Sequence, residues 1–192
     1  MGIMELFKIK KLILPIILII PVVSCSSDSG KESTVEKITP SDTIFSYDSL
    51  TSVGFKKSKK FKVEGLTKAN SAYFGFLKDT KADYEVRFYD SHKDAVDYGT
   101  VFAEERTGED AVLKKENATW KEGVKEARSC AGDSLAKGDA VNLGGHHIGT
   151  CMAAKYSDYI IYGNMILLCE GYEPEVSMLN CSNIIEKLVK EE

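Results

Sequence analysis

The chain has 192 residues, of which 43% are hydrophobic and 28% are charged, and its formal net charge is −4. This length suits one domain or two small ones, and the composition excludes a collagen, a mucin-like stalk and a wholly disordered chain. The mild acidity argues against a nucleic-acid-binding protein, which normally carries a strong basic excess.

The first 24 residues have the pattern of a secretory signal peptide, a basic stretch followed by a short apolar one. Lys8, Lys10 and Lys11 precede an apolar run over residues 12–23. A helix that crosses a bilayer needs about 20 apolar residues, so this run is too short to be a good membrane span. The sequence therefore predicts an exported protein.

The run ends with Val22-Val23, and Ser24-Cys25 follow; these four residues resemble the lipobox of bacterial lipoproteins. The resemblance implies that the leader over 1–24 is removed, that the Cys25 thiol receives a diacylglycerol, and that the domain is held outside the cytoplasm at a cell-envelope membrane. An ordinary cleaved signal peptide and an uncleaved anchor are the alternatives.

The mature chain is more acidic than the precursor. Residues 1–24 hold three lysines and one glutamate, so the chain from Cys25 on has 22 basic and 28 acidic residues, a net charge of −6. Anionic headgroups would mildly repel such a chain. We therefore expect the lipid anchor, and not surface charge, to hold the protein to the membrane.

The tether and the first elements follow. Residues 25–43, the lipidated cysteine and a polar stretch, are predicted to form a flexible tether, and a single folded domain is predicted over 44–192. A short helix is expected from Tyr47 to Gly54, and the glycine ends it.

Residues 55–63 contain five lysines. They are predicted to form a solvated edge strand, because lysines on an edge discourage aberrant pairing; contact with acidic lipid or nucleic acid is the alternative.

Two strands and a helix are predicted next. Strands are expected over 71–77 and 84–90, joined by a polar turn. The alternation in the second strand is typical of a half-buried strand, with Glu85 and Arg87 on its polar face. Ser91 then fits a helix cap. The apolar stripe of the following helix consists of Ala95, Val96, Gly99, Phe102 and Ala103.

The middle of the chain is weakly patterned, with a short helix expected over 120–128 and a loop over 132–149 that contains a strand at 140–143. After it, the sequence predicts a strand over 150–156, a tight turn at 157–158 and a long central strand over 159–169, apolar on both faces. The last helix is expected from Pro174 to about Lys190, with a buried stripe of Met178, Cys181, Ile185 and Leu188.

The order strand–strand–helix thus occurs twice. It predicts an α+β fold, an antiparallel sheet with helices packed on one face, stapled by disulfides in its C-terminal half. The two halves share no sequence identity, so the repeat is one of pattern only.

Four cysteines remain once Cys25 is set aside: Cys130, Cys151, Cys169 and Cys181. An even number in an exported chain indicates two disulfides. Cys169 is expected on the same strand face as Ile161, Met165 and Leu167, and Cys181 on the buried stripe of the following helix. A Cys169–Cys181 bridge would tie that helix to the sheet, which leaves Cys130–Cys151 by elimination. Free buried thiols are an alternative, and a zinc site is a poor one because no C-x-x-C occurs.

Two polar motifs in the weakly patterned region suggest chemistry. Gly132-Asp133-Ser134-Leu135 spells the signature of the GDSL hydrolases, but no Asp-x-x-His follows it. A serine nucleophile needs a base within hydrogen-bond reach, which His146 or His147 would have to supply. These adjacent histidines are also the candidates for a metal site; the alternative is an incidental pair in a loop, which is the simpler interpretation. We therefore expect no catalytic residues, no metal and no cofactor.

Aromatic residues supply the weak candidates for ligand binding: Tyr156, Tyr159, Tyr162 and Trp120. Such residues are also ordinary in strands and cores. Because no catalytic constellation is complete, the sequence favours a non-enzymatic, membrane-anchored module that binds an envelope protein or a small molecule, and no nucleic acid. A small envelope hydrolase using Ser134 and a metal-binding lipoprotein are the alternatives.

Overall fold

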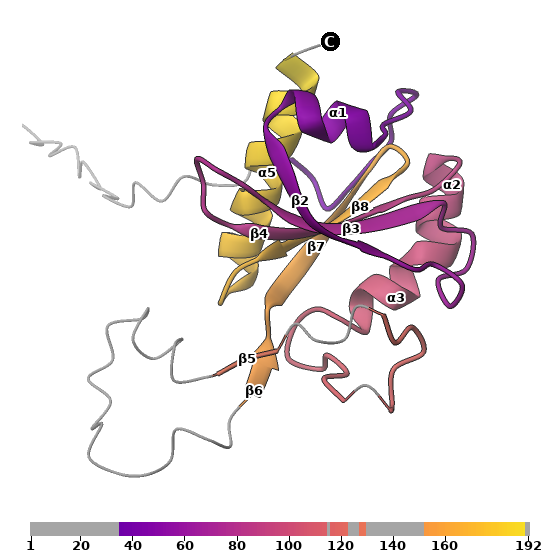
Figure 1. Ribbon diagram of the computed structural model, residues 1–192, viewed down its shortest axis with the longest axis vertical. Helices are drawn as coiled ribbons and strands as arrows, with labels where there is room; N and C mark the ends of the chain where they lie inside the picture. Colours follow the sequence, from indigo (N-terminus) through magenta and orange to yellow (C-terminus); the bar gives the residue numbers. More distant parts are fainter. Residues whose placement is uncertain (1–34, 115, 123–126, 130–151, 191–192) are drawn as a thin grey trace, which may run out of the picture. The chain divides into compact units, whose positions relative to one another are not determined.

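The computed structural model describes residues 35–114, 116–122, 127–129 and 152–190. Contacts divide the chain into residues 1–30 and residues 31–192, and all described residues belong to the second unit. This unit contains a six-stranded sheet with helices against it and a separate two-stranded sheet (Figure 1).

The six strands lie in the order β1-β7-β8-β4-β3-β2. All neighbours are antiparallel except β1 and β7, which are parallel. Their bounds are β1 Ile38–Thr39, β2 Phe55–Phe61, β3 Ser71–Leu77, β4 Asp83–Phe88, β7 Tyr156–Tyr162 and β8 Met165–Glu170. The α+β class is confirmed, and the sheet is mixed because of the short parallel strand β1.

Strand β1 comes from the segment that the sequence assigned to the tether. The Ile161 amide donates to the Lys37 carbonyl at 2.8 Å, and the Gly163 amide donates to the Thr39 carbonyl at 3.0 Å. Val35 packs against the core. The fold therefore begins nearer to residue 35 than to the expected boundary at 44, because backbone hydrogen bonds add this short strand to the edge of β7 and Val35 packs against the core.

The helices fall into three groups. Helix α1 (Tyr47–Ser52) precedes β2, and α5 (Pro174–Lys190) follows β8. Between β4 and the second half lies one continuous helical segment: α2 (His92–Asp94), the π-helical turn η1 (Ala95–Gly99) and α3 (Thr100–Glu104). The Ser91 hydroxyl caps this segment by accepting from the Asp94 amide at 3.1 Å, as expected. The strand–strand–helix order is thus found twice.

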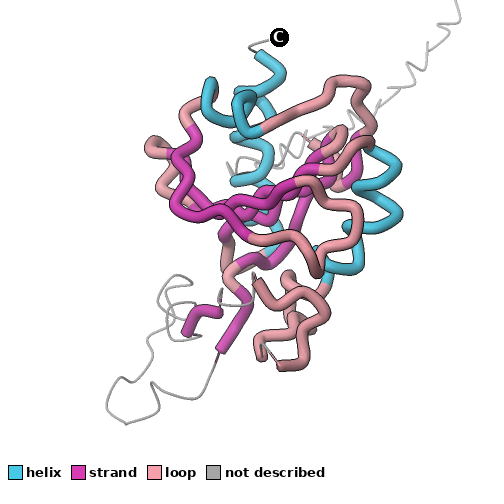
Figure 2. The backbone as a smooth tube through the Cα atoms, turned by 45° about the vertical axis from the view of Figure 1, so that its right-hand side comes forward, coloured by secondary structure: helices cyan, strands magenta, loops and turns pink. Residues whose placement is uncertain are grey.

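The two long helical segments lie on opposite faces of the sheet, and the expectation of one face is wrong (Figures 1 and 2). Met165 and Leu167 of β8 pack with residues of α5. Ile166 and Leu168, which alternate with them, pack with Ala95 and Ala103 of the α2–α3 segment. Central strands that are apolar on both faces need cover on both. We call these sides the α5 face and the α3 face.

The second hairpin turns later than predicted. The sequence suggested a turn at 157–158 and one long strand over 159–169, but β7 ends at Tyr162 and β8 begins at Met165. The turn is Gly163–Asn164, and Gly163 has a positive φ of 52°, which glycine adopts without strain. Ile161 consequently lies on the α3 face and not on the face of Cys169.

The expected helix over 120–128 is also not found in its described part. Residues 120–122 are not helical, and residues 127–129 form strand β5 (Ala127–Ser129), which pairs with β6 (Met152–Ala154). The register places Ser129 opposite Met152.

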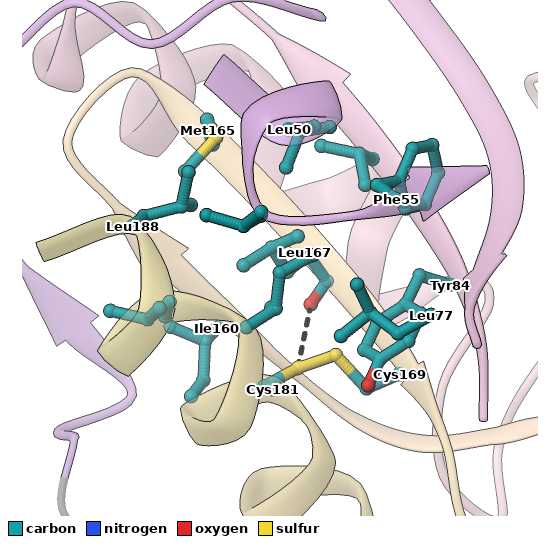
Figure 3. Packing of buried hydrophobic residues seen from close by; sticks show 14 of the residues in the cluster. Leu50, Phe55, Leu77, Tyr84, Ile160, Met165, Leu167, Cys169, Cys181 and Leu188 are labelled. Carbon is teal, nitrogen blue, oxygen red and sulfur yellow. Dashed lines mark hydrogen bonds between the residues drawn. A yellow bond between two sulfur atoms is a disulfide. The ribbon is translucent and has the colours of Figure 1, made fainter. Parts of the chain in front are cut away.

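The disulfide Cys169–Cys181 is present and joins β8 to α5 (Figure 3). Both cysteines are fully buried, and their Cα atoms are 5.6 Å apart. The Cys181 sulfur lies 3.4 Å from the Leu167 carbonyl oxygen. The bridge thus ties the last helix to the central strand, as predicted.

Candidate functional site

The aromatic residues proposed as ligand contacts do not form one groove. Tyr156 and Tyr159 are buried in the core on the α3 face, and Trp120 is buried against Phe61. Burial is also the main reason that the pKa of Tyr159 rises to about 12. Tyr162 is partly buried and lines a shallow groove of about 390 Å³ with Val35 and Ile185, among other residues. Three of the four therefore serve packing.

Several other candidates fall outside the described residues: Cys25, Cys130, Ser134, His146, His147 and Cys151. Within the part of the chain that the structure describes, no group of three or more His, Cys, Asp or Glu side chains is placed to hold a metal ion.

The most distinctive exposed feature is the strand β2 at one end of the sheet. Lys56, Lys57, Lys59 and Lys60 are all exposed on it, and Lys62 is exposed directly after it. We call these five residues the lysine edge. The sequence interpretation of this segment as an edge strand is confirmed.

The positive charge of the lysine edge is not neutralised by ion pairs with the described residues. Lysines elsewhere form ion pairs, such as Lys37 with Asp158 at 2.6 Å and Lys155 with Asp83. None of the lysine-edge residues has a carboxylate within 4.0 Å in the described part of the chain. Five such charges within seven residues stand out in a chain whose formal net charge is −4.

Aromatic rings lie beneath the lysines. Tyr47 of α1 and Tyr73 of β3 have ring centroids 4.8 Å apart. The Lys57 ammonium is 4.7 Å from the Tyr47 centroid and 5.6 Å from that of Tyr73, and the Lys60 ammonium is 5.8 Å from the latter. Cation–π contacts of this kind contribute about 0.5–1 kcal/mol each at exposed sites. They hold the ammonium groups near the sheet surface without cancelling their charge.

The same tyrosine pair lines one side of a groove of about 460 Å³ at the end of β3 and β4. Polar groups lie on its other side, where the Asn70 amide donates to the Asp90 carboxylate at 2.7 Å. At its base the buried Asn164 side chain accepts from the Phe45 amide at 2.8 Å and donates to the carbonyl oxygens of Phe45 and Tyr89. The groove adjoins the lysine edge, because the tyrosine pair that lines it also contacts Lys57.

A second charged cluster lies inside the protein, on the α3 face. The fully buried Arg87 donates from Nε to Glu85 Oε1 at 2.8 Å, and its Nη2 lies 2.7 Å from the same oxygen. Arg106 Nη2 is 3.5 Å from Glu85 Oε2. The Arg87 guanidinium also lies 4.6 Å from the Trp120 ring centroid. Because these groups are buried, we assign them a structural role.

This buried cluster corrects the expected polar face of the second strand. Glu85 and Arg87 were expected to face solvent, but the segment around Trp120 and Arg106 covers them. The sequence indicates this buried ion pair only through two opposite charges, Glu85 and Arg87, that lie two residues apart on the same face of one strand. The partners come from far along the chain and could not be paired from sequence alone.

Comparisons with known proteins add one finding. A family model described as a family of unknown function, DUF6810, matches residues 46–190. No curated protein and no solved structure matches the chain. No helix among the described residues is long and apolar enough to cross a membrane.

Proposed function

We propose that this chain, which belongs to the DUF6810 family, is a lipoprotein anchored through Cys25 outside the cytoplasm, where it acts as a non-enzymatic binding module. Its binding surface is the lysine edge together with the Tyr47–Tyr73 pair, and its partner is anionic. The lipobox resemblance of residues 22–25 supports the anchor, and the exposed charge of the lysine edge supports the binding role.

The observation that carries the binding role is the uncompensated charge of the lysine edge. An exposed lysine is well hydrated and pays little to remain unpaired, so single examples need no explanation. Here five occur together, on the edge of a domain whose mature chain is acidic. A concentrated charge of one sign steers an oppositely charged partner to it and raises the association rate.

The anchor is tested by fractionation of cells that express the full chain. The unaltered protein is expected in the membrane fraction, with a mass that begins at Cys25 and includes acyl chains. Cys25→Ala removes the thiol that would carry the lipid, so this variant is expected to remain a precursor without acyl chains. Unlipidated wild-type protein would contradict the proposal.

The binding role is tested with a fluorescent polyglutamate and the purified full chain in detergent. The variant Lys57→Glu/Lys60→Glu is expected to bind at least about tenfold more weakly than wild type at low salt. The control Lys93→Glu/Lys190→Glu changes the same charge at two exposed helical positions and is expected to bind within about twofold of wild type. Equal losses in both variants would show that only net charge matters, and would contradict a localised site.

A further inference from the structure

We infer that the lysine edge binds an extended acidic polypeptide segment that pairs with β2 and extends the sheet by one strand. This inference rests on the proposed function, since it takes the same surface as the binding site. It adds the chemical class of the partner and the geometry of its binding.

The backbone of β2 provides the first part of the argument. β2 is the last strand of its sheet, and it pairs with β3 on one side only. Among the described residues no strand lies against its other side. An edge strand of this kind presents a row of unpaired N–H and C=O groups, which are a template for a further strand. Exposed positions over 56–60 leave that row accessible.

The distribution of the lysines over the two faces provides the second part. Lys57 and Lys60 pair in register with Gly75 and Tyr73, and they contact the tyrosines of the α5 face. Lys59 pairs with Phe74 and lies 4.8 Å from the ring centroid of Phe61 on the α3 face. The edge therefore carries ammonium groups above and below the plane of the sheet.

An added strand matches this layout. Its side chains alternate between the two faces, and residues directly opposite each other across two strands have Cβ atoms about 5 Å apart. Acidic side chains on successive residues would meet lysines on both faces, while the backbone groups of the segment would pair with β2. A phosphate-bearing polymer or a headgroup would use the charge and leave the backbone groups unused, so the edge favours a polypeptide.

The lysines also disfavour pairing of β2 with the same strand of a second copy of the chain. Like charges directly opposite each other destabilise strand pairing, so pairing with β2 of a second copy would set lysine against lysine. Lysines on an edge act in this way against aggregation. The same charges favour an acidic strand. The register shift between Lys57 and Lys59 interrupts the ladder, so we expect a short segment, of about four to six paired residues.

The experiment measures binding of three labelled peptides to the full chain in detergent micelles by fluorescence anisotropy. The first is an eight-residue peptide of glutamate, threonine and valine with acidic residues at successive positions. The second has the same sequence with all of its backbone nitrogens methylated, so that its charge is kept and both of its edges are blocked from pairing. The third replaces every glutamate by glutamine. Binding of the first peptide is expected to exceed that of both others by at least about tenfold.

Hydrogen exchange gives a second measurement, because attraction between charges alone should not protect the backbone amides of β2 from exchange. The first peptide is expected to slow exchange of backbone amides within residues 56–61, and the methylated peptide is not. Each pair of lysines is then reversed separately: both Lys57→Glu/Lys60→Glu and Lys56→Glu/Lys59→Glu should weaken binding, because the segment contacts both faces.

The outcomes separate the two proposals. Equal binding of the methylated and unmethylated peptides would overturn strand addition and leave an anionic binding surface intact. Binding to vesicles of phosphatidylglycerol without binding to any peptide would overturn strand addition and identify the surface as a lipid contact. Absence of binding to the peptides, to polyglutamate and to the vesicles would overturn both proposals.

Discussion

The buried cluster of Glu85, Arg87 and Arg106 gives the sharpest test of the structure. Glu85 contacts Arg87 through Nε at 2.8 Å and Nη2 at 2.7 Å, and it contacts Arg106 at 3.5 Å. Removing one partner of a buried ion pair leaves a buried charge without compensation, which typically costs about 3–5 kcal/mol. In this cluster, one carboxylate serves two guanidinium groups, so the cost should depend on which partner is removed.

Glu85→Gln is expected to destabilise the protein more than Arg87→Met. The first change keeps the volume of the side chain but leaves two guanidinium groups near each other without their shared carboxylate, and we expect a loss of about 5 kcal/mol. The second change leaves Glu85 with Arg106 and replaces the contact with Trp120 by an apolar one, so we expect a loss of about 3 kcal/mol. For a domain of this size, 5 kcal/mol lowers the Tm by roughly 10–20 °C.

The double variant Glu85→Gln/Arg87→Met measures the coupling energy between the two residues, because its loss of stability can be compared with the sum of the two single losses. If the pair acts as a unit, the double variant loses about 5 kcal/mol and not the sum of about 8 kcal/mol. Unfolding is followed in urea, because guanidinium chloride would screen the charges. Lys93→Met removes an exposed ion pair with Asp97 and should leave the urea midpoint unchanged. Additive losses, or a greater loss for Arg87→Met than for Glu85→Gln, would refute the reasoning.

Three further predictions concern the core. The double variant Cys169→Ala/Cys181→Ala opens a loop of 12 residues and should lose about 3 kcal/mol in urea unfolding; a loss below about 1 kcal/mol would contradict this. Gly99→Ala would bring a methyl group to 2.4 Å from Ile166 Cδ1 and should cost about 1–3 kcal/mol, and Ile166→Val in the same chain should restore part of the Tm. Burial raises the pKa of Tyr89 from its ordinary value of 10 to about 12, so its contribution to stability is complete below pH 10 and is lost between pH 10 and 12, where the unfolded chain releases the proton first. The urea midpoint should fall over that range, and less so in Tyr89→Phe; an equal fall in both would argue against the assignment.

Local patterns predicted the elements that depend on local physics. The strand Ser71–Leu77, which holds three aromatic residues, is found with the bounds expected from the sequence. The cap at Ser91 lies where its hydroxyl can accept from the Asp94 amide. The spacing of Cys181 along the last helix predicted a position facing the sheet, and it is bonded to Cys169. In each case a periodicity or a short-range hydrogen bond carries the information.

Features that depend on distant partners were not predictable in the same way. Gly163–Asn164 lies inside a continuous apolar run, so its turn was hidden, although a Gly-Asn pair is a known hairpin signal. Asn164 can end the run because its side chain binds the backbone of Phe45 and Tyr89. The lysine edge was visible in the sequence as an edge strand. Its tyrosine pair, Tyr47 and Tyr73, was not, because the two rings come from elements that meet only in the folded chain.

The helices on opposite faces explain why the two halves are not a symmetric repeat. In the strand order, β4 and β8 lie side by side and antiparallel. A two-fold axis between them, perpendicular to the sheet, would exchange the hairpins but would keep both helices on one face. The chain instead covers one face with each helix, which buries the charged face of β4 and requires Arg106 and Trp120 to compensate it. With helices on both faces of the sheet, the unpaired strand edges among the described residues lie at β1 and at β2, where the lysines lie, and this is why the proposed binding site is at β2.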